Sequence, residues 1–519
     1  MSRSIPPSEL ANHNNIDSLW LAIDGVVYDL TEFAPTHPGG LSVLLDHAGG
    51  DGTEAYNAVH SPSLLLSTLP ASKQLGRLSS PVPVLAASSS QPTPKPKQKP
   101  PLSSLISVND FRLVARDFLP PKTLAFVSSA ATDCHTHRRN STTYSQITLR
   151  PRVLIDVSAP VSLKTTILGQ PVSSPIFVSP TSLGKTVHPE GEREIARACK
   201  ELGGVAQIVS TSASFTVADV IQAALDHPIP SSPDGSQQQN NTNDDIPVFL
   251  QLYVDKHAPN TSALLHSLTS PNGPSKIKGV FLTVDAPVPG KREADERIQS
   301  TTSTSSSPTI NTTTPMATQL TPHPDTNGSA LGRLMASYIS PSLTWTHTLP
   351  FLRRHLPPGT PIVLKGIQTA SDALRAFHAG VSGILISNHG GRSLDTSPAS
   401  ILVLLEIQRC CPEVLEGMEV FVDGGVGRGS DVLKALCLGA RGVGVGRGVL
   451  WGLGGYGREG VRRVLEILND ELVTSMKMCG VTSLDELHPG MVNTRAIDHL
   501  VPDTLSEEHP YAKWRRSKL

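Results

Sequence analysis

The sequence predicts an α/β protein in which a (β/α)8 barrel, a TIM barrel, follows a small N-terminal domain. Three observations carry this prediction. Eight short apolar runs each end in a polar residue or a glycine, helix-length segments lie between most of them, and a low-complexity stretch precedes them all. The eight runs are residues 176–180, 207–211, 249–254, 280–286, 362–366, 383–391, 420–425 and 442–447.

The segments between the runs have the apolar spacing of amphipathic helices. In residues 191–203, 371–380 and 430–440, apolar side chains recur every three or four positions. Continuous apolar strands that alternate with helices indicate a parallel sheet covered on both faces. We expect eight such units to close into a barrel; a doubly wound open sheet is the alternative.

Low-complexity stretches divide the chain into parts. The expected parts are a small domain over 5–78, a flexible linker rich in Pro, Ser and Lys over 79–104, the barrel over 105–501 and a tail over 502–519. Two further polar stretches, 231–245 and about 300–328, contain too few apolar residues to form a core. We expect both to be surface insertions in the barrel.

The charge balance and the cysteines exclude several classes of protein. The chain has 44 Lys and Arg against 45 Asp and Glu, a formal net charge of -1, so it has no long-range field to attract nucleic acid or an anionic membrane. No apolar run approaches the ~18 residues of a membrane span. The six cysteines form no CxxC pair, which favours buried thiols over a disulfide framework or a zinc site.

The two ends of the sequence bear on its location in the cell. The N-terminal stretch has neither an apolar signal core nor a long Arg-rich amphipathic segment. The last three residues, Ser517-Lys518-Leu519, match a peroxisomal targeting signal, so we expect a peroxisomal protein. An exposed basic tail is the alternative interpretation, because Arg515 and Arg516 lie just upstream.

Polar side chains and glycines gather where the predicted strands end. In a TIM barrel these ends surround one active site, and eight polar ends together are hard to explain as turn residues. The glycine-rich loops 423–429 and 446–448 follow the last two strands, where barrels commonly bind a phosphate. The residues that this rule places in the pocket are Ser179, Thr181, Ser210, Gln251, Tyr253, Thr283, Asp285, Lys365, His389, Asp423 and Arg447.

Five segments make the prediction more specific. FLQLYV (249–254), LTVDAPVPGKRE (282–293), VLKGI (363–367), SNHGGRSLD (387–395) and the segment 422–447 resemble the family of FMN-dependent 2-hydroxy-acid dehydrogenases and oxidases. The resemblance extends from about Ser107 to Val501 and is interrupted by the two insertions. It implies a barrel that binds FMN and oxidises a small 2-hydroxy acid.

The resemblance also implies roles for the catalytic residues. His389 is expected to be the base at the substrate α-carbon or hydroxyl, and Asp285 is expected to stabilise its protonated form. Arg392 and Arg292 would bind the substrate carboxylate, since guanidinium groups match it with paired hydrogen bonds. Tyr253 would hydrogen-bond the substrate hydroxyl.

A second set of residues is expected to contact FMN. Lys365 would lie beside the flavin and offset negative charge on the reduced ring. The remaining expected contacts are Pro180, Thr181, Ser182, Ser210, Gln251, Thr283, Asp423, Gly425, Arg428, Gly446 and Arg447.

Two positions depart from the family pattern. Phe126 stands where the family usually has a tyrosine that contacts the substrate carboxylate, so one hydrogen bond to a charged group, worth ~1.5–3 kcal/mol, is missing. Gly427 replaces the first arginine that contacts the phosphate, and Arg428 is a possible substitute. We expect weakened activity or FMN binding, and we keep a non-catalytic, haem-binding redox sensor as an alternative.

The small domain resembles cytochrome b5 over residues 20–61. His37 lies in an HPGG segment, and His60 follows beyond a helical stretch. Two imidazoles on opposite sides of a haem b would fill both axial positions, which favours electron transfer over binding of O2. The resemblance therefore implies that His37 and His60 are the iron ligands.

The two modules in this order resemble the flavocytochrome b2 family of L-lactate dehydrogenases. This resemblance implies that electrons pass from FMN to haem b and then to a cytochrome c-like protein, and that the enzyme is a homotetramer. A mitochondrial location is the alternative that it suggests. A peroxisomal oxidase that passes electrons to O2 and gives H2O2 is the competing function. The sequence leaves open which 2-hydroxy acid is the substrate.

Overall fold

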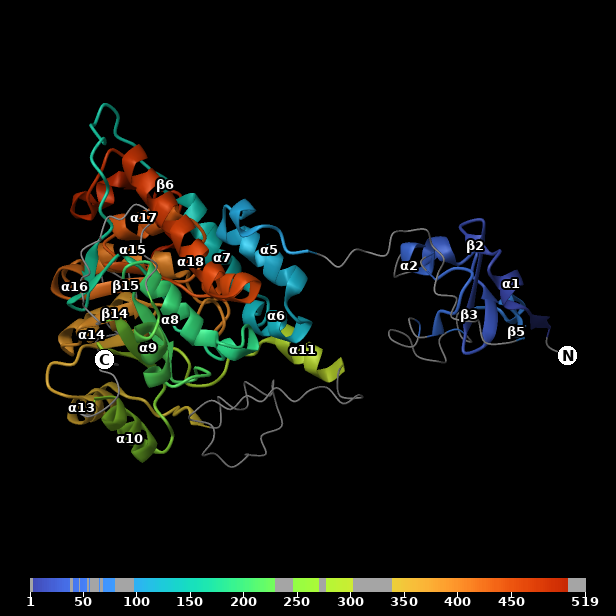
Figure 1. The fold of residues 1–519 in the computed structure, drawn as a ribbon, viewed down its shortest axis with the longest axis horizontal. Helices are drawn as coiled ribbons and strands as arrows, with labels where there is room; N and C mark the ends of the chain where they lie inside the picture. The colour runs from blue at the N-terminus through green and yellow to red at the C-terminus, as the bar shows by residue number, and fades with distance from the viewer. Residues whose placement is uncertain are drawn as a thin grey trace. The chain divides into compact units, whose positions relative to one another are not determined.

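The computed structural model describes residues 3–37, 41–45, 47–53, 56, 65, 69–79, 98–228, 246–269, 277–301 and 338–502. The chain divides into two compact units, Met1–Gln98 and Lys99–Leu519. Figure 1 labels the elements of each unit.

The N-terminal unit contains a five-stranded sheet with strand order β1-β5-β4-β3-β2. Asp24 and Gly25 join β3 to β4 with φ angles of 49° and 74°, the positive pair that an Asp-Gly hairpin turn favours. Leu19, Leu21 and Ile23 alternate along β3, and all three are buried in one core. The elements are β1 (Ser4–Ile5), α1 (Pro7–Leu10), β2 (Asn14–Asn15), β3 (Ser18–Ile23), β4 (Val26–Asp29), η1 (Ala34–Thr36), α2 (Leu41–Leu45), η2 (Ala71–Lys73) and β5 (Gln74–Leu78).

The larger unit is a closed barrel of eight parallel strands, which confirms the predicted fold. Val443 of β16 pairs with Ile176 of β9, so the sheet closes and the open-sheet alternative is wrong. The strands are β9 (Ile176–Val178), β10 (Gln207–Ser210), β11 (Val248–Leu252), β12 (Val280–Thr283), β13 (Ile362–Ile367), β14 (Gly383–Ile386), β15 (Glu419–Asp423) and β16 (Gly442–Val445).

Aromatic rings fill the interior of the barrel and determine where its polar layer begins. Phe177, Phe249, Phe281 and Phe421 belong to one buried cluster, and the rings of Phe177 and Phe421 meet edge to face at 5.8 Å. Side chains on a strand alternate between its two faces, so the residue two positions later faces the interior again. These later residues are Ser179, Gln251, Thr283 and Asp423. Alternation along the strands thus places the predicted pocket residues in one layer.

Helices surround the barrel (Figure 1). Those that follow the strands are α8 (Gly191–Glu201), α9 (Val217–Leu225), α10 (Ala258–Thr269), α13 (Trp345–His355), α14 (Ala370–His378), α15 (Ser400–Cys410), α17 (Gly429–Cys437) and α18 (Arg447–Met478). The additional helices are α5 (Val108–Phe118), α6 (Pro121–Ser128), α7 (His135–Gln146), α11 (Glu293–Thr301) and α16 (Glu413–Gly417). No helix in the described ranges is long and apolar enough to cross a membrane.

The connection from β12 to α13 returns to the barrel at a defined place. Tyr338 and Ser340 form backbone hydrogen bonds with the segment after β11: Lys256 N donates to Tyr338 O at 2.7 Å, and Ser340 N donates to Val254 O at 2.8 Å. The buried Tyr338 hydroxyl is also hydrogen-bonded to Ser212 Oγ. At the start of the connection, Lys291 O accepts from Thr132 N at 3.0 Å. Both described ends of the connection are therefore fixed.

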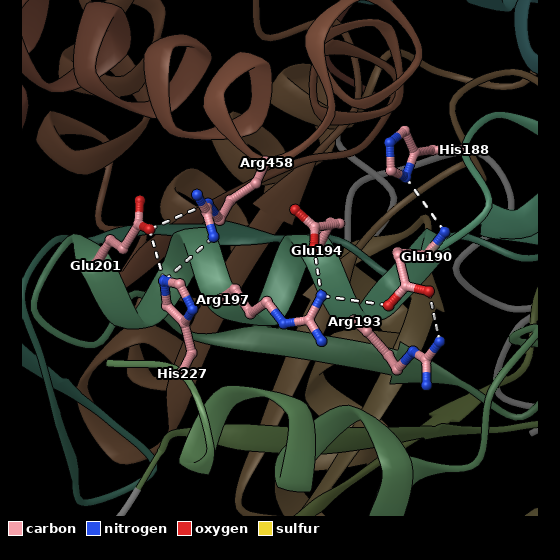
Figure 2. A network of polar contacts seen from close by, with 8 residues as sticks. All are labelled: His188, Glu190, Arg193, Glu194, Arg197, Glu201, His227 and Arg458. Carbon is pink, nitrogen blue, oxygen red and sulfur yellow. Dashed lines mark hydrogen bonds and ion pairs between the residues drawn. The ribbon is translucent and has the colours of Figure 1, made fainter. Parts of the chain in front are cut away.

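A network of polar contacts follows α8 and joins it to α18 (Figure 2). Glu201, at the end of α8, lies 2.7 Å from His227 Nε2 and 3.1 Å from Arg458 Nε. Its side chain is only 9% exposed, so these partners offset the cost of burying a carboxylate. The network holds together α8, the segment after α9 and the part of α18 that follows its kink at Tyr456 and Gly457.

Candidate active site

A cavity of about 560 Å³ is lined by residues at the carboxyl ends of the barrel strands. Thr283 and Asp285 lie behind its lining, hydrogen-bonded to Gln251 and His389 respectively. The predicted residues that line the cavity are Ser179, Pro180, Thr181, Ser182, Ser210, Gln251, Tyr253, Arg292, Lys365, His389, Arg392, Asp423, Gly425, Arg428, Gly446 and Arg447. The structure thus brings the residues predicted for the barrel site into one place.

His389 links a tyrosine to a buried carboxylate. Its Nε2 lies 3.2 Å from Tyr253 Oη, and its Nδ1 lies 3.2 Å from Asp285 Oδ1. An ionised carboxylate only accepts hydrogen bonds, so the hydrogen belongs on Nδ1, and the Nε2 lone pair faces Tyr253 and the cavity. His389 has a positive φ of 59°, and its backbone N–H donates to Ser387 Oγ at 3.1 Å.

The charges around Asp285 favour its ionised form. Burial raises the pKa of Asp285, but Lys365 and His389 lower it by more, and the net pKa lies below the usual value. Burial lowers the pKa of His389 and Lys365 lowers it further, while Asp285 raises it in part; the net direction is down. His389 is therefore a neutral base near pH 7 beside a carboxylate that stabilises its protonated form.

The close packing of Asp285 depends on a glycine. Gly366 has φ +111°, and a Cβ at that position would lie 2.5 Å from Asp285 Cβ. Only glycine fits both the backbone angle and the space. The strand end at Lys365 and Gly366 thus supplies a cation for Asp285 and the room in which Asp285 lies.

Two arginines form a site for an anion. The guanidinium carbons of Arg392 and Arg292 lie 5.3 Å and 5.9 Å from the centre of the Phe126 ring. Burial and the neighbouring Arg292 hold the pKa of Arg392 well below its usual value. Asp295 is 3.8 Å from Arg292 Nε, and this buried nitrogen forms no hydrogen bond within the described ranges. The pair has room and charge for a carboxylate, and Phe126 supplies a ring but no hydroxyl.

A row of hydrogen-bonded side chains crosses three neighbouring strands. Ser210 Oγ donates to Gln251 Oε1 at 2.7 Å, and Gln251 Nε2 donates to Thr283 Oγ1 at 2.8 Å. Lys365 Nζ is buried at the same end of the barrel and has no hydrogen-bond partner in the described residues. A flavin presents ring nitrogens and carbonyl oxygens along one edge. The row and the lysine supply a donor and acceptor set that fits this edge.

Glycine loops and Arg447 form the other end of the cavity. Gly425 has φ +85°, and a Cβ there would lie 2.2 Å from Asn140 O. Arg447 Nη2 donates to Gly390 O at 2.9 Å, and Nη1 lies 2.9 Å from His137 Nδ1. Asp423 accepts from Ser179 Oγ at 3.1 Å. The start of α18, together with Arg447, suits the phosphate of FMN. At the start of α17, the backbone N–H groups of residues 427–429 already donate to Asp431 and Glu471.

Arg428 lines the cavity but is engaged elsewhere. Its Nη1 lies 2.8 Å from Glu471 Oε1, and its side chain is 53% exposed. Gly427 carries no side chain, and a Cβ built there would meet no atom within 4 Å. The loop after β15 therefore offers the phosphate little free positive charge.

The structure describes one of the two expected haem ligands. His37 follows η1 and is half-buried, and its ring lies 5.8 Å from the ring of Phe33. Imidazoles ligate haem iron in many cytochromes, so His37 would be one of the residues that hold the haem. His60 lies outside the described residues.

The prediction that pocket residues follow the barrel strands misses the residues that α5 and α7 contribute to the cavity. Arg112, His137 and Ser141 line the cavity although they precede the first barrel strand. Asn140 and Asn388 exchange hydrogen bonds of 2.8 Å and 2.7 Å and hold α7 against the end of β14. The helical spacing of Val108 and Arg112, four residues apart, is the one sequence signal that places both on the same face of α5.

Comparisons with known proteins agree with this geometry. The profile of FMN-dependent dehydrogenases matches residues 115–494, and that of the cytochrome b5-like heme/steroid binding domain matches residues 6–79. The L-lactate dehydrogenase (cytochrome) of Saccharomyces cerevisiae is 37% identical over 506 residues, which cover 95% of this chain and 80% of that protein. The peroxisomal (S)-2-hydroxy-acid oxidase of Oryza sativa subsp. japonica is 39% identical over 389 residues, which cover 75% of this chain and 96% of the oxidase.

Solved structures show the same relationship. A flavocytochrome b2 double mutant with pyruvate bound has a TM-score of 0.64 and 37% identity, over 77% of this chain and 89% of the other. A mandelate oxidase with (S)-4-hydroxymandelic acid has a TM-score of 0.63 and 30% identity, over 75% of this chain and 98% of the oxidase. Fold, site and sequence agree: the chain belongs to the FMN-dependent dehydrogenase family and carries a cytochrome b5-like domain ahead of its barrel.

Proposed function

We propose that this protein oxidises a small L-2-hydroxy acid to the 2-oxo acid and passes the electrons from FMN to haem b. One observation carries the proposal. The hydrogen-bonded series Tyr253–His389–Asp285 faces a cavity that also contains Arg292 and Arg392. A base, a hydroxyl and paired cations are the groups that the oxidation of a hydroxy acid requires.

Binding of the substrate follows from the charges. Arg392 and Arg292 bind the carboxylate, and the positive charge on each favours this, since no acidic residue other than Asp295 lies within 4 Å of them in the described ranges. Tyr253 lines the same cavity as both arginines, so its hydroxyl can reach a substrate whose carboxylate they bind. Tyr253 then hydrogen-bonds the substrate hydroxyl on the adjacent carbon.

Removal of a proton falls to His389. Its Nε2 takes the proton from the substrate hydroxyl or α-carbon, and its Nδ1–H stays hydrogen-bonded to Asp285. The imidazolium that forms is stabilised by the ionised carboxylate. His389 takes one of the two protons, and the electron pair with the second proton would pass to FMN, so that the C–O single bond becomes the carbonyl of the 2-oxo acid.

Both cofactors fit residues of this chain. FMN, when bound, accepts the two electrons and releases them singly, and haem b carries one electron at a time. Ser210, Gln251 and Thr283 hold the flavin edge, while Lys365 offsets negative charge on it. Pro180, Thr181 and Ser182 line the cavity beside them. His37 and His60 are the proposed axial ligands of haem b.

The candidate substrate and the candidate final electron acceptor are inferred from the relatives. L-Lactate is the first candidate substrate, because relatives at 37% and 35% identity that align with 95% of this chain are named for it. A cytochrome c-like protein is the proposed acceptor. The oxidase reaction with O2 is the second candidate, supported by the 39% identical peroxisomal oxidase. Reoxidation of substrate-reduced enzyme by ferricytochrome c and by O2, with H2O2 measured, separates the two.

Two further properties remain proposals. A homotetramer is proposed from the family resemblance, and light scattering of the purified chain tests it. Peroxisomal import is predicted from Ser517-Lys518-Leu519, which lie outside the described residues, with mitochondria as the alternative. Fluorescence microscopy of the tagged chain, with and without these three residues, tests the prediction.

The catalytic proposal is tested by His389→Gln. The variant should retain FMN, yet reduction of the flavin by L-lactate in an anaerobic stopped-flow experiment should be about 10²–10⁴-fold slower, because a positioned base is lost. His355→Gln on α13, where the ring contacts Phe351 outside the cavity, is the matched control. Near-normal flavin reduction in His389→Gln would refute the mechanism.

A further inference from the structure

The N-terminal half of α5 lies against the part of the cavity that is formed by the start of α18. A Cβ at Gly448, in the first turn of α18, would lie 2.9 Å from Val108 Cγ1. Ser107 caps α5 through a reciprocal pair of hydrogen bonds with Asp110, which fixes the beginning of the helix. Arg112 lies one turn after Val108, and both line the cavity.

The arginines at this end of the cavity differ in how free they are to bind a phosphate. Arg428 is ion-paired with Glu471 at 2.8 Å, and Gly427 has no side chain. Arg447 is held by hydrogen bonds to backbone carbonyls, among them Gly390 O at 2.9 Å. A phosphate bound there carries nearly two negative charges, so one further cation is expected at its open side.

Arg112 is a cation with free hydrogen-bond donors at this place. Its Nε donates to Asn109 Oδ1 at 2.9 Å, which orients the guanidinium group. Its two terminal nitrogens form no hydrogen bond or ion pair in the part of the chain that the structure describes. The side chain is exposed at the edge of the cavity, so it can reach a bound group without first breaking another contact.

Arg112 is one of several arginines around His137, a residue that also lines the cavity. Burial, followed by Arg447 and other arginines including Arg112, lowers the pKa of His137 to about 4. His137 also contacts Arg447 at 2.9 Å. Arg112 and Arg447 therefore act on the same small region from α5 and from α18.

We propose that Arg112 binds the terminal phosphate of FMN and supplies the guanidinium group that the loop after β15 lacks at Gly427. This inference rests on the proposed use of FMN. It assigns the phosphate a contact from α5, an element outside the strand–helix repeats of the barrel. Position 427 can accept an arginine, because its surroundings are open and its φ is outside the left-handed region.

The test compares two flavins that differ only in the phosphate. FMN and riboflavin are titrated into the flavin-free full chain, and the quenching of flavin fluorescence gives each dissociation constant. Arg112→Met should weaken FMN binding about tenfold and change riboflavin binding less than twofold, because one charge-assisted hydrogen bond to phosphate is lost. Adding Gly427→Arg to Arg112→Met should restore the FMN affinity.

The control is Arg116→Met, one turn further along α5. Arg116 pairs with Asp117 at 2.9 Å and does not line the cavity, so both affinities should stay unchanged. An unchanged FMN affinity in Arg112→Met, or an equal loss for riboflavin, would overturn the proposal. Failure of Gly427→Arg to restore binding would show that the two positions do not face the same phosphate. A wild-type chain that bound neither flavin would instead overturn the use of FMN.

Discussion

Replacing Phe126 by tyrosine should strengthen substrate binding. The Phe126 ring lies near two guanidinium groups, 5.3 Å from that of Arg392 and 5.9 Å from that of Arg292, and it lines the cavity. Its backbone is fixed, because Arg392 Nη1 donates to Phe126 O at 2.9 Å. Tyrosine keeps the ring and its contacts with the cations and adds one donor toward the substrate carboxylate.

The size of the effect follows from what the site already provides. A hydrogen bond to a charged group contributes ~1.5–3 kcal/mol. In the proposed mechanism two arginines already share the carboxylate, so the lower figure applies, and ~1.5 kcal/mol corresponds to about a tenfold lower KM. The rate at saturating substrate should change little, because His389 and Asp285 are untouched.

The assay is the steady-state KM of Phe126→Tyr for L-lactate, with FMN content and Tm measured on the same preparation. Phe118→Tyr is the control, since Phe118 does not line the cavity. An unchanged or higher KM with normal FMN content and Tm would refute the reasoning. It would mean that the ring of Phe126 does not meet the substrate carboxylate.

Three other changes test separate parts of the structure. Asp285→Asn should slow flavin reduction ~10²-fold or more. It should also move the acid limb of the pH–rate profile to lower pH, since Asp285 raises the pKa of His389; a limb that moved upward would contradict the assignment. His37→Ala should abolish a six-coordinate b-type haem spectrum and leave FMN bound, which absorbance spectra of the purified variant measure. Glu201→Gln should lower Tm by roughly 2–4 °C in a thermal melt, because a buried carboxylate that pairs with His227 and Arg458 is lost, whereas Glu190→Gln, at a more exposed carboxylate, should not.

The barrel could be predicted because its strands carry a strong local signal. The runs at 176–180 and 207–211 became β9 (Ile176–Val178) and β10 (Gln207–Ser210), each ending where a polar residue begins the pocket layer. The alternation of side chains between the two faces of a strand depends only on backbone geometry, so it does not depend on the conformation of the loops. The same regularity placed Lys365 correctly at the cavity.

Features that depend on contacts between distant segments could not be predicted. The run at 383–391 contains β14 only as far as Ile386; His389 lies beyond it with a left-handed φ of 59° that no local pattern indicates. Arg112 and His137 reach the cavity from helices that precede the barrel. Arg112 is placed by the packing of α5 on α18 at Gly448, and His137 by the hydrogen bonds of Asn140 on α7 with Asn388. Both contacts join residues far apart in the sequence.

Because both ends of the connection from β12 to α13 are anchored, its length should have little effect on the free energy of unfolding of the barrel. Closing a flexible loop costs free energy that grows only with the logarithm of its length, about 0.6 kcal/mol for each doubling. Hydrogen bonds at Lys291 and at Tyr338 hold the two ends whatever lies between residues 302 and 337. A natural or designed change in the length of that interval should therefore leave the barrel with nearly its full stability.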